Sequence, residues 1–390
     1  MTPQELLNKI DAMLPDIREL RHTLHRIPEI AAAEFKTAAF LREKLRPYQL
    51  EFREPLLGTD VVADLDTGRP GKTILLRADI DALPLDESTG APYASEHPGM
   101  AHACGHDGHM AMLLGAVRLL DGIRDQLNGR IRFVFQPGEE VRALGGEMVA
   151  KGLLKNPDVE FCAALHGWPG VPEGVIETRP GPIMAAAGHF KVKIFGKGGH
   201  GSSPELTIDP LLTACEAVMM LQSIVSRRLD PQAASVLGVC QLSAGQSSNV
   251  IPDTAEFAGT TRALDRVTAA RFEPEMRRIL EHVTAANGAS YEMDYDQAYE
   301  VTVNDPAAVE TAKLAVTRYL GADAYRELPR PAMGAEDFGY YLAEVPGVYA
   351  RLGMGVDAVG LHNPRYDFND RALRHGIAFF AALALELNGR

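Results

Sequence analysis

The chain has 390 residues, of which 46% are apolar and 23% charged, and its formal net charge is -13 at pH 7. This length exceeds the usual size of one hydrophobic core, so we expect two domains rather than one. The acidic balance argues against nucleic acid or an anionic membrane surface as a partner, because both require a basic face.

The first half of the chain alternates between helical and strand patterns. Apolar residues at every third or fourth position predict helices over residues 4–24 and 109–120. Short β-rich runs predict strands at residues 61–65, 73–78, 131–135, 161–165 and 175–178. This alternation predicts an α/β fold with a mixed, mostly parallel sheet flanked by helices.

The pattern changes near residue 188. The next elements are a strand (189–196), a helix (208–227), two strands (235–242 and 254–262), a helix (269–286) and a strand (290–295). This βαββαβ order predicts a smaller α+β sandwich with helices on one face of a mainly antiparallel sheet. The alternation resumes after residue 305 and ends in a helix over 371–387. We therefore expect a catalytic domain, residues 1–186 and 301–390, interrupted by an inserted domain, residues 187–300.

The N-terminus mixes acidic and basic residues and lacks the apolar core and cleavage site of a signal peptide. The four cysteines are too sparse for a disulfide framework. We therefore expect a cytoplasmic protein whose cysteines remain reduced.

The densest group of metal-binding residue types is the segment HACGHDGH, residues 102–109. Cysteine and histidine are the donors that borderline metals such as zinc prefer, and the glycines allow nearby donors to converge. Asp107 is expected to cap the helix that follows. A structural zinc site would need a second cysteine pair, so the segment favours a catalytic metal site over a polar loop with chance histidines.

Three further segments place acidic or imidazole side chains after predicted strands. Glu139 and Glu140 follow the apolar run and the Pro-Gly turn of FVFQPGEE, and in extended backbone they would point to opposite sides. One could bind metal while the other faces a metal-bound water. His166 and His362 each follow an apolar stretch, which would deliver them to the same edge of the sheet. Either histidine alone is more often structural, but together they supply the imidazoles that a two-metal site requires.

The motifs, in order, resemble those of the aminoacylase and carboxypeptidase superfamily of dinuclear metallohydrolases, which has a zinc-peptidase-like catalytic domain. Within it the chain is similar to hippurate hydrolases, N-acyl-L-amino-acid amidohydrolases and plant auxin-conjugate hydrolases. The resemblance extends nearly end to end: RHTLHRIPE (21–29), RADIDALP (77–84), HACGHDGH, FQPGEE (135–140), LHGWP (165–169), GKGGHGSSP (196–204), SSNVIPD (247–253), GAEDFGYY (334–341) and LHNPRYDFND (361–370).

The resemblance implies two divalent ions, zinc or manganese with nickel or cobalt as alternatives, held by Cys104, His106, Glu140, His166 and His362. Cys104 would bridge the ions, Glu139 would be the general base, and Asp81 would orient a ligand or the base. The wider superfamily usually has Asp at the bridging position and His where Asp79 stands. His106 is interpreted as replacing that imidazole.

In the inserted domain, the glycine-rich loop around His200 would by itself predict only a turn. The resemblance implies that this domain is a lid that forms a homodimer or a higher oligomer. His200 would then reach the partner's active site and stabilise the tetrahedral oxyanion. Asn249 and Arg262 are expected to bind the oxyanion or the carboxylate of the substrate, since Arg can bind a carboxylate through two hydrogen bonds.

We therefore expect hydrolysis of N-acyl (acetyl, benzoyl or similar) L-amino acids to a carboxylic acid and a free amino acid. The attacking group would be a hydroxide shared by the two metal ions. A dipeptidase or aminopeptidase of the same fold is the alternative, and it would need an acidic anchor for the substrate's ammonium group. A metal-binding protein without catalysis fits poorly with the presence of Glu139 and a full ligand set.

Overall fold

A computed structural model describes residues 1–390, with the side chain of Arg142 excepted. The chain divides into two units. The first contains Met1–Ile183, Val303–Arg330 and Asp337–Arg390, and the second contains Met184–Thr302 and Pro331–Glu336. The expected boundaries after residues 186 and 300 fall close to these divisions. The grouping of Pro331–Glu336 with the second unit has no counterpart in the sequence patterns.

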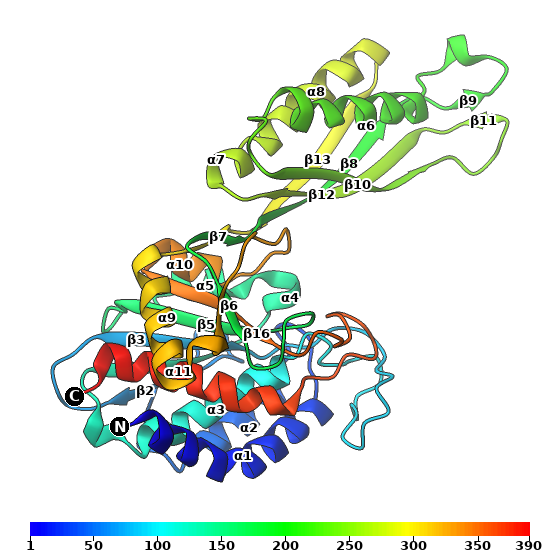
Figure 1. The fold of residues 1–390 in the computed structure, drawn as a ribbon. Helices are drawn as coiled ribbons and strands as arrows, with labels where there is room; N and C mark the ends of the chain where they lie inside the picture. Colours follow the sequence, from blue (N-terminus) through cyan, green and yellow to red (C-terminus); the bar gives the residue numbers. More distant parts are fainter. The chain divides into compact units, whose positions relative to one another are not determined.

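An eight-stranded sheet forms the centre of the first unit (Figure 1). In order across the sheet, the strands are β1 (Glu51–Phe52), β2 (Val61–Asp66), β4 (Arg130–Gln136), β3 (Thr73–Asp79), β5 (Phe161–Trp168), β16 (Gly347–Gly353), β6 (Ile176–Thr178) and β15 (Tyr325–Glu327). The pairs β4–β3, β3–β5, β5–β16 and β6–β15 are parallel and the other pairs are antiparallel. All seven residues of β3 are buried, as expected for a central strand covered on both faces.

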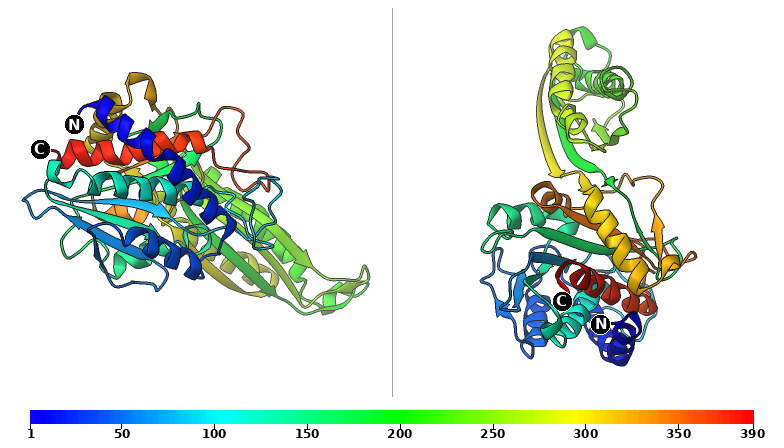
Figure 2. Two further views of the ribbon diagram at one scale, coloured as in Figure 1. Left: turned by 90° about the horizontal axis from the view of Figure 1, so that it is seen from below. Right: turned by 60° about the vertical axis from the view of Figure 1, so that its left-hand side comes forward.

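Helices cover both faces of this sheet. One face carries α1 (Pro3–Arg26), α2 (Phe35–Leu45), α3 (His106–Asp121), α9 (Pro306–Tyr319) and α11 (Leu373–Asn388), and Figure 2 shows α1, α3 and α11 side by side. On the other face, α5 (Leu144–Ala150) packs against α10 (Gly339–Glu344). α11 is apolar over most of its circumference, which explains why it lies in the core. Among the described helices, none has both the length and the apolar character needed to cross a bilayer.

The second unit is an antiparallel sheet with helices on one face (Figure 1). The sheet order is β10 (Ser235–Ala244), β12 (Thr254–Ala263), β8 (Ala186–Phe195) and β13 (Ser290–Tyr299), and α6 (Pro210–Arg227) packs beside α8 (Phe272–Asn287). A separate core forms where apolar side chains of these helices meet alternate residues of the strands. The shorter elements of the chain are α4 (Glu139–Arg142), α7 (Arg266–Ala269), β7 (Gly181–Met184), β9 (Gly199–His200), β11 (Val250–Ile251) and β14 (Thr302–Asn304).

The predicted α/β class, with a mixed sheet flanked by helices, is confirmed. No bounds were predicted for α2, α9 and β16. The elements for which bounds were predicted lie within a few residues of them, but α3 begins at His106 rather than at residue 109. The cause is Gly105, which adopts a left-handed φ of 87° and starts the helix directly after Cys104. This early start matters for the site, because it places His106 on the first turn of a helix.

Candidate metal centre

The five side chains predicted to bind metal come together in the first unit. Cys104 lies in the loop before α3, and its Sγ atom is 3.4 Å from the Nε2 atom of His166 in β5. Glu140 of α4 lies between the other two imidazoles. Its Oε1 atom is 3.8 Å from Nε2 of His106, and its Oε2 atom is 3.3 Å from Nε2 of His362. The donor atoms thus come from two loops, the helices α3 and α4 and the strand β5, and they meet in one cluster.

Backbone geometry explains how these donors converge. Gly105 separates Cys104 from His106 with a left-handed turn, and a Cβ atom added to Gly105 would lie 2.9 Å from the hydroxyl of Tyr366. The loop around His362 is held against this turn, since the backbone N–H of His362 donates to the carbonyl of Ala103 at 2.8 Å. The side chain of His362 is 56% exposed, so this side of the cluster faces solvent.

The donor atoms fit a metal centre. Nε2 of His106 and Oε1 of Glu140 are buried and lack a hydrogen-bond partner among the described residues. Buried polar atoms of this kind are costly unless a cation or a polar partner satisfies them. Burial and the carboxylates of Glu140 and Glu139 raise the pKa of the Cys104 thiol well above its usual value. A thiolate at this position therefore requires a nearby cation, which a divalent metal would supply.

The carboxylates around His106 also favour a cation. Burial opposes protonation of His106, but Asp79 and Asp81 outweigh it and raise the pKa of the ring to about 10. The Nδ1 atom of His106 is 2.8 Å from the backbone oxygen of Asp81, so Nδ1 carries a proton and a neutral ring presents its lone pair at Nε2. Asp81 also accepts a hydrogen bond from the backbone N–H of Glu140 at 2.9 Å. Asp81 thus contacts two candidate ligands, His106 through its backbone oxygen and Glu140 through its carboxylate.

Glu139 and Glu140 do not lie in extended backbone, so that prediction is wrong. Gly138 adopts a φ of 64°, and the two glutamates form the start of α4. Their side chains therefore diverge by about 100° around a helix rather than pointing to opposite faces. Glu139 is only 7% exposed, and its charge contributes to the raised pKa of Cys104.

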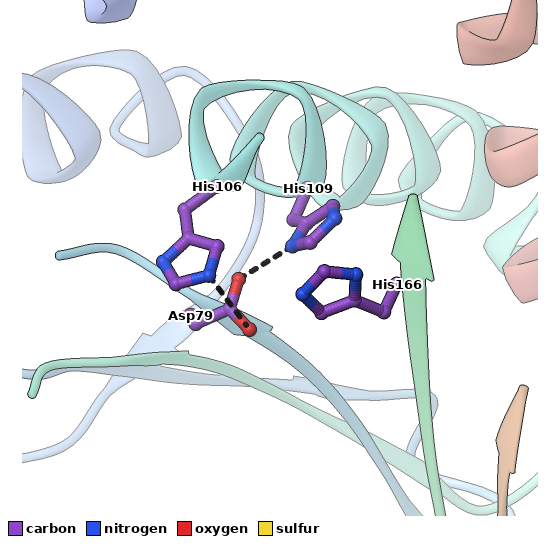
Figure 3. A group of neighbouring side chains, drawn as sticks. All are labelled: Asp79, His106, His109 and His166. Atoms are coloured by element: carbon purple, nitrogen blue, oxygen red, sulfur yellow. Dashed lines mark hydrogen bonds and ion pairs between the residues drawn. The ribbon is translucent and has the colours of Figure 1, made fainter. Parts of the chain in front are cut away.

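Asp79 and His109 belong to the buried cluster, although the sequence analysis gave them no role at the metal centre. Figure 3 shows both beside His106 and His166. Nδ1 of His109 is 2.6 Å from Oδ1 of Asp79, and its Nε2 atom accepts a hydrogen bond from the N–H of Gly167 at 2.8 Å. The ring therefore has no free nitrogen for a metal. The available signal was an acidic residue at the end of a strand that is otherwise apolar, since a buried carboxylate requires a partner.

Two other local predictions are wrong. Asp107 does not cap α3. Its Oδ2 atom is buried against α1, 2.7 Å from Nε of Arg21 and 2.8 Å from Nδ1 of His25. Burial would raise the pKa of Asp107, but Arg21 and His25 hold it well below its usual range. His362 does not follow a strand directly, because β16 ends at Gly353 and His362 lies in a loop with a φ of 61°.

The three remaining predicted residues lie in the second unit. His200 is in β9, which pairs with β11, and the N–H of Gly201 donates to the carbonyl of Asn249 at 2.8 Å, so His200 and Asn249 are neighbours. Nδ1 of His200 is 2.7 Å from the hydroxyl of Ser202. Arg262 lies at the opposite end of β12, where it pairs with Ala187 of β8. About eight residues of strand, or about 25 Å, separate Arg262 from the end near His200.

The chain matches peptidase family M20/M25/M40 over residues 75–386. It is 35% identical over 395 residues to a protein named thermostable carboxypeptidase 2 from Saccharolobus solfataricus, with 99% of each chain covered. It is 41% identical over 306 residues to an N-acyl-L-amino acid amidohydrolase from Geobacillus stearothermophilus, with 78% of this chain and 82% of the relative covered. A solved structure from Bacillus subtilis, described as a dinuclear metal binding peptidase from the M20 family, is 32% identical with a TM-score of 0.83 and covers 96% of this chain and 98% of its own.

Proposed function

The chain belongs to peptidase family M20/M25/M40 and is a hydrolase of amide bonds; within that activity, we propose that it cleaves N-acyl L-amino acids to a carboxylic acid and a free amino acid. The observation that carries this proposal is the convergence of one thiol, three imidazoles and a carboxylate, all buried except the exposed ring of His362, in the same part of the chain as a second buried carboxylate, Glu139. The similarity to a relative named N-acyl-L-amino acid amidohydrolase supports the substrate class.

We assign the five donors Cys104, His106, Glu140, His166 and His362 to two divalent ions, zinc or manganese, with nickel or cobalt as alternatives. When bound, the ions would lower the pKa of a water molecule and polarise the scissile carbonyl. Cys104 and Glu140 would contribute two negative charges that offset part of the metal charge. Glu139 would accept the proton of the attacking water and pass it to the departing amine. Asp81, through its contacts with His106 and Glu140, would hold both ligands in place.

The second unit would supply the remaining proposed contacts and act as a lid. His200 and Asn249 would stabilise the oxyanion, and Arg262 would bind the carboxylate of the substrate. The separation of about 25 Å between Arg262 and the His200 end of the unit exceeds the length of one N-acyl amino acid. One copy of the unit therefore cannot supply both sets of contacts to a single substrate. This supports a homodimer in which His200 and Asn249 serve the partner's active site.

A peptidase acting on free peptides is the second candidate, and the relative named a carboxypeptidase favours it. A dipeptidase or aminopeptidase must bind the ammonium group of its substrate, whereas an N-acyl amino acid presents an uncharged acyl group at that end. We also propose a cytoplasmic location, because a reducing compartment keeps the thiol of Cys104 available for metal.

The test is release of free amino acid from matched substrates by the metal-loaded protein. Hippurate and N-acetyl amino acids form one set, and dipeptides with a free amino group and the same C-terminal residues form the other. Glu139→Gln serves as the control for contaminating hydrolases. We expect turnover of the acylated set. Turnover confined to the dipeptides would replace the proposal with the peptidase alternative.

A further inference from the structure

A continuous chain of polar contacts runs from β3 through α3 to the candidate ligand His166. Nη1 of Arg77 donates to Oδ2 of Asp79 at 2.7 Å, and Oδ1 of Asp79 is 2.6 Å from Nδ1 of His109. Nε2 of His109 accepts the N–H of Gly167 at 2.8 Å. The oxygen of Gly167 in turn lies 2.8 Å from Nδ1 of His166. The four charged or imidazole side chains in this series of contacts, Arg77, Asp79, His109 and His166, are all buried.

The partners determine which nitrogen of His109 carries a proton. The backbone N–H of Gly167 can only donate, so Nε2 of His109 must be unprotonated. One oxygen of Asp79 accepts from Nη1 of Arg77 and the other faces Nδ1 of His109, and a neutral imidazole carries one proton. Nδ1 of His109 must therefore carry the proton. His109 is a neutral ring whose two nitrogens are both engaged.

The same reasoning extends to His166. The carbonyl of Gly167 can only accept, so Nδ1 of His166 is protonated and Nε2 holds the lone pair. That lone pair faces Sγ of Cys104 at 3.4 Å, where the proposed metal centre lies. Gly167 is therefore held on both sides of its position: its N–H by His109 and its carbonyl by His166.

We infer that Asp79 and His109 are positioning residues of the metal centre: Asp79 fixes the proton of His109 on Nδ1, and His109 holds Gly167 so that Nε2 of His166 faces the metal. This inference rests on the proposed function, because it assumes that His166 is a ligand. Replacing a side chain that orients a metal ligand without touching the metal commonly lowers metal affinity by ~10–100-fold.

A ligand role is the main alternative for these two residues. Donor atoms of Asp79, His106, His109 and His166 lie within 4.8 Å of one another, a spacing that could hold an ion. Both carboxylate oxygens of Asp79 and both nitrogens of His109 are already in hydrogen bonds, however. If either residue bound a metal ion, it would lose a hydrogen bond in the series of contacts that reaches His166.

The metal affinities of two variants, measured by competition with a chelator, separate these roles. His109→Gln supplies an amide oxygen that can accept the N–H of Gly167, whereas His109→Leu fills a similar volume without an acceptor. A positioning role predicts that His109→Leu loses ~10–100-fold in affinity and that His109→Gln recovers most of it. Equal losses of affinity in both variants would indicate a ligand, and wild-type affinity in both variants would indicate simple packing. Either result would overturn the inference.

Asp79→Asn gives a second test with almost no change in shape. Arg77 would hold the amide oxygen of Asn, so the NH₂ group would face His109 and move the proton of the ring to Nε2, against the N–H of Gly167. We expect the same ~10–100-fold loss of affinity, with the changed tautomer of His109 visible by NMR of metal-free, ¹⁵N-histidine-labelled protein. An unchanged affinity and tautomer would contradict the inference. His375→Leu, which alters a partly buried histidine of α11 outside these contacts, should bind metal as the wild type does.

The wild-type measurement tests the proposed function separately. Failure of the wild type to bind metal would remove the proposed centre itself. Normal binding by the wild type and by all four variants would leave that centre intact and remove only the roles of Asp79 and His109.

Discussion

The Nε2 atom of His362 lies 3.3 Å from the Oε2 atom of Glu140, a contact between the loop that follows β16 and the short helix that follows β4. The hydrogen bond to Glu140 raises the pKa of His362. In the absence of metal, this pair therefore retains a proton where a divalent ion would bind. Metal binding must displace that proton, which makes the affinity for metal fall as the pH decreases.

The adjacent residues Glu139 and Glu140 provide a matched pair of variants. Glu139→Gln removes the proposed general base, and we expect kcat to fall by ~10²–10⁴-fold while the metal content stays at the wild-type level. Glu140→Gln removes a ligand and should lower the metal content as well. Metal analysis of the two purified variants alongside their kinetics distinguishes the roles. Wild-type kcat in Glu139→Gln would eliminate Glu139 as the base.

Cys104 is proposed to bridge the two ions, so its replacement should affect both. Cys104→Ala is expected to lose bound metal and activity together. Cys104→Asp should retain more metal than Cys104→Ala, because a carboxylate can also bridge two cations. The number of ions per chain in each variant, measured by mass spectrometry of the metal, is the readout. Two ions bound to Cys104→Ala would show that Cys104 is no bridge.

The pair His25 and Asp107 predicts a pH-dependent contribution to stability. Burial lowers the pKa of His25, but the effect of Asp107 and Glu87 is larger and raises this pKa to about 9. The unfolded value is about 6.5. Protonated His25 therefore contributes about 3 kcal/mol to the free energy of unfolding. This contribution is complete below about pH 6.5 and is lost as the pH rises toward 9.

We expect His25→Gln to cost more unfolding free energy at about pH 6 than at about pH 10, by that amount. Urea unfolding of the metal-free protein at the two pH values measures the difference. His282→Gln alters an exposed histidine and should show no such pH dependence. An equal cost of His25→Gln at both pH values would show that protonated His25 does not stabilise the fold.

Subunit mixing tests whether His200 acts across a dimer. His200→Ala and Glu139→Gln chains should each be inactive, yet a mixed dimer contains one active site with both wild-type residues. We therefore expect activity to return after the two variants exchange subunits. The fraction of mixed dimers can be followed by native mass spectrometry. Mixed dimers without activity would indicate that His200 does not serve the partner's site.

Much of the fold and most of the proposed ligand set could be predicted from sequence. Periodicity predicted most of the long helices and strands, because many residues in a row repeat the same burial pattern, but it placed neither α2 and α9 nor the strand β16. β7, β9, β11 and β14 were missed, since strands of two to four residues contain too little pattern. The five proposed ligands were assigned through the family resemblance, because each stands in a motif whose residue types have a metal-binding chemistry of their own, and their role stays a prediction.

The errors concern partners that are remote in sequence. Asp107 has the local signature of a helix cap, but Arg21, which lies 86 positions earlier, pairs with it in the core. Asp79 and His109 were missed because local sequence does not show which buried polar groups meet. Glu139 and Glu140 were placed in extended backbone because strand periodicity does not reveal the left-handed turn at Gly138.

The central claim is that this chain hydrolyses N-acyl amino acids with two divalent ions held by Cys104, His106, Glu140, His166 and His362. The most direct measurement is a titration of the metal-free protein with zinc or manganese while release of amino acid from an N-acetyl amino acid is monitored. We predict no turnover without metal and a rise in rate that saturates at two ions per chain. Full activity of the metal-free protein, or saturation with metal without any release of amino acid, would contradict the claim.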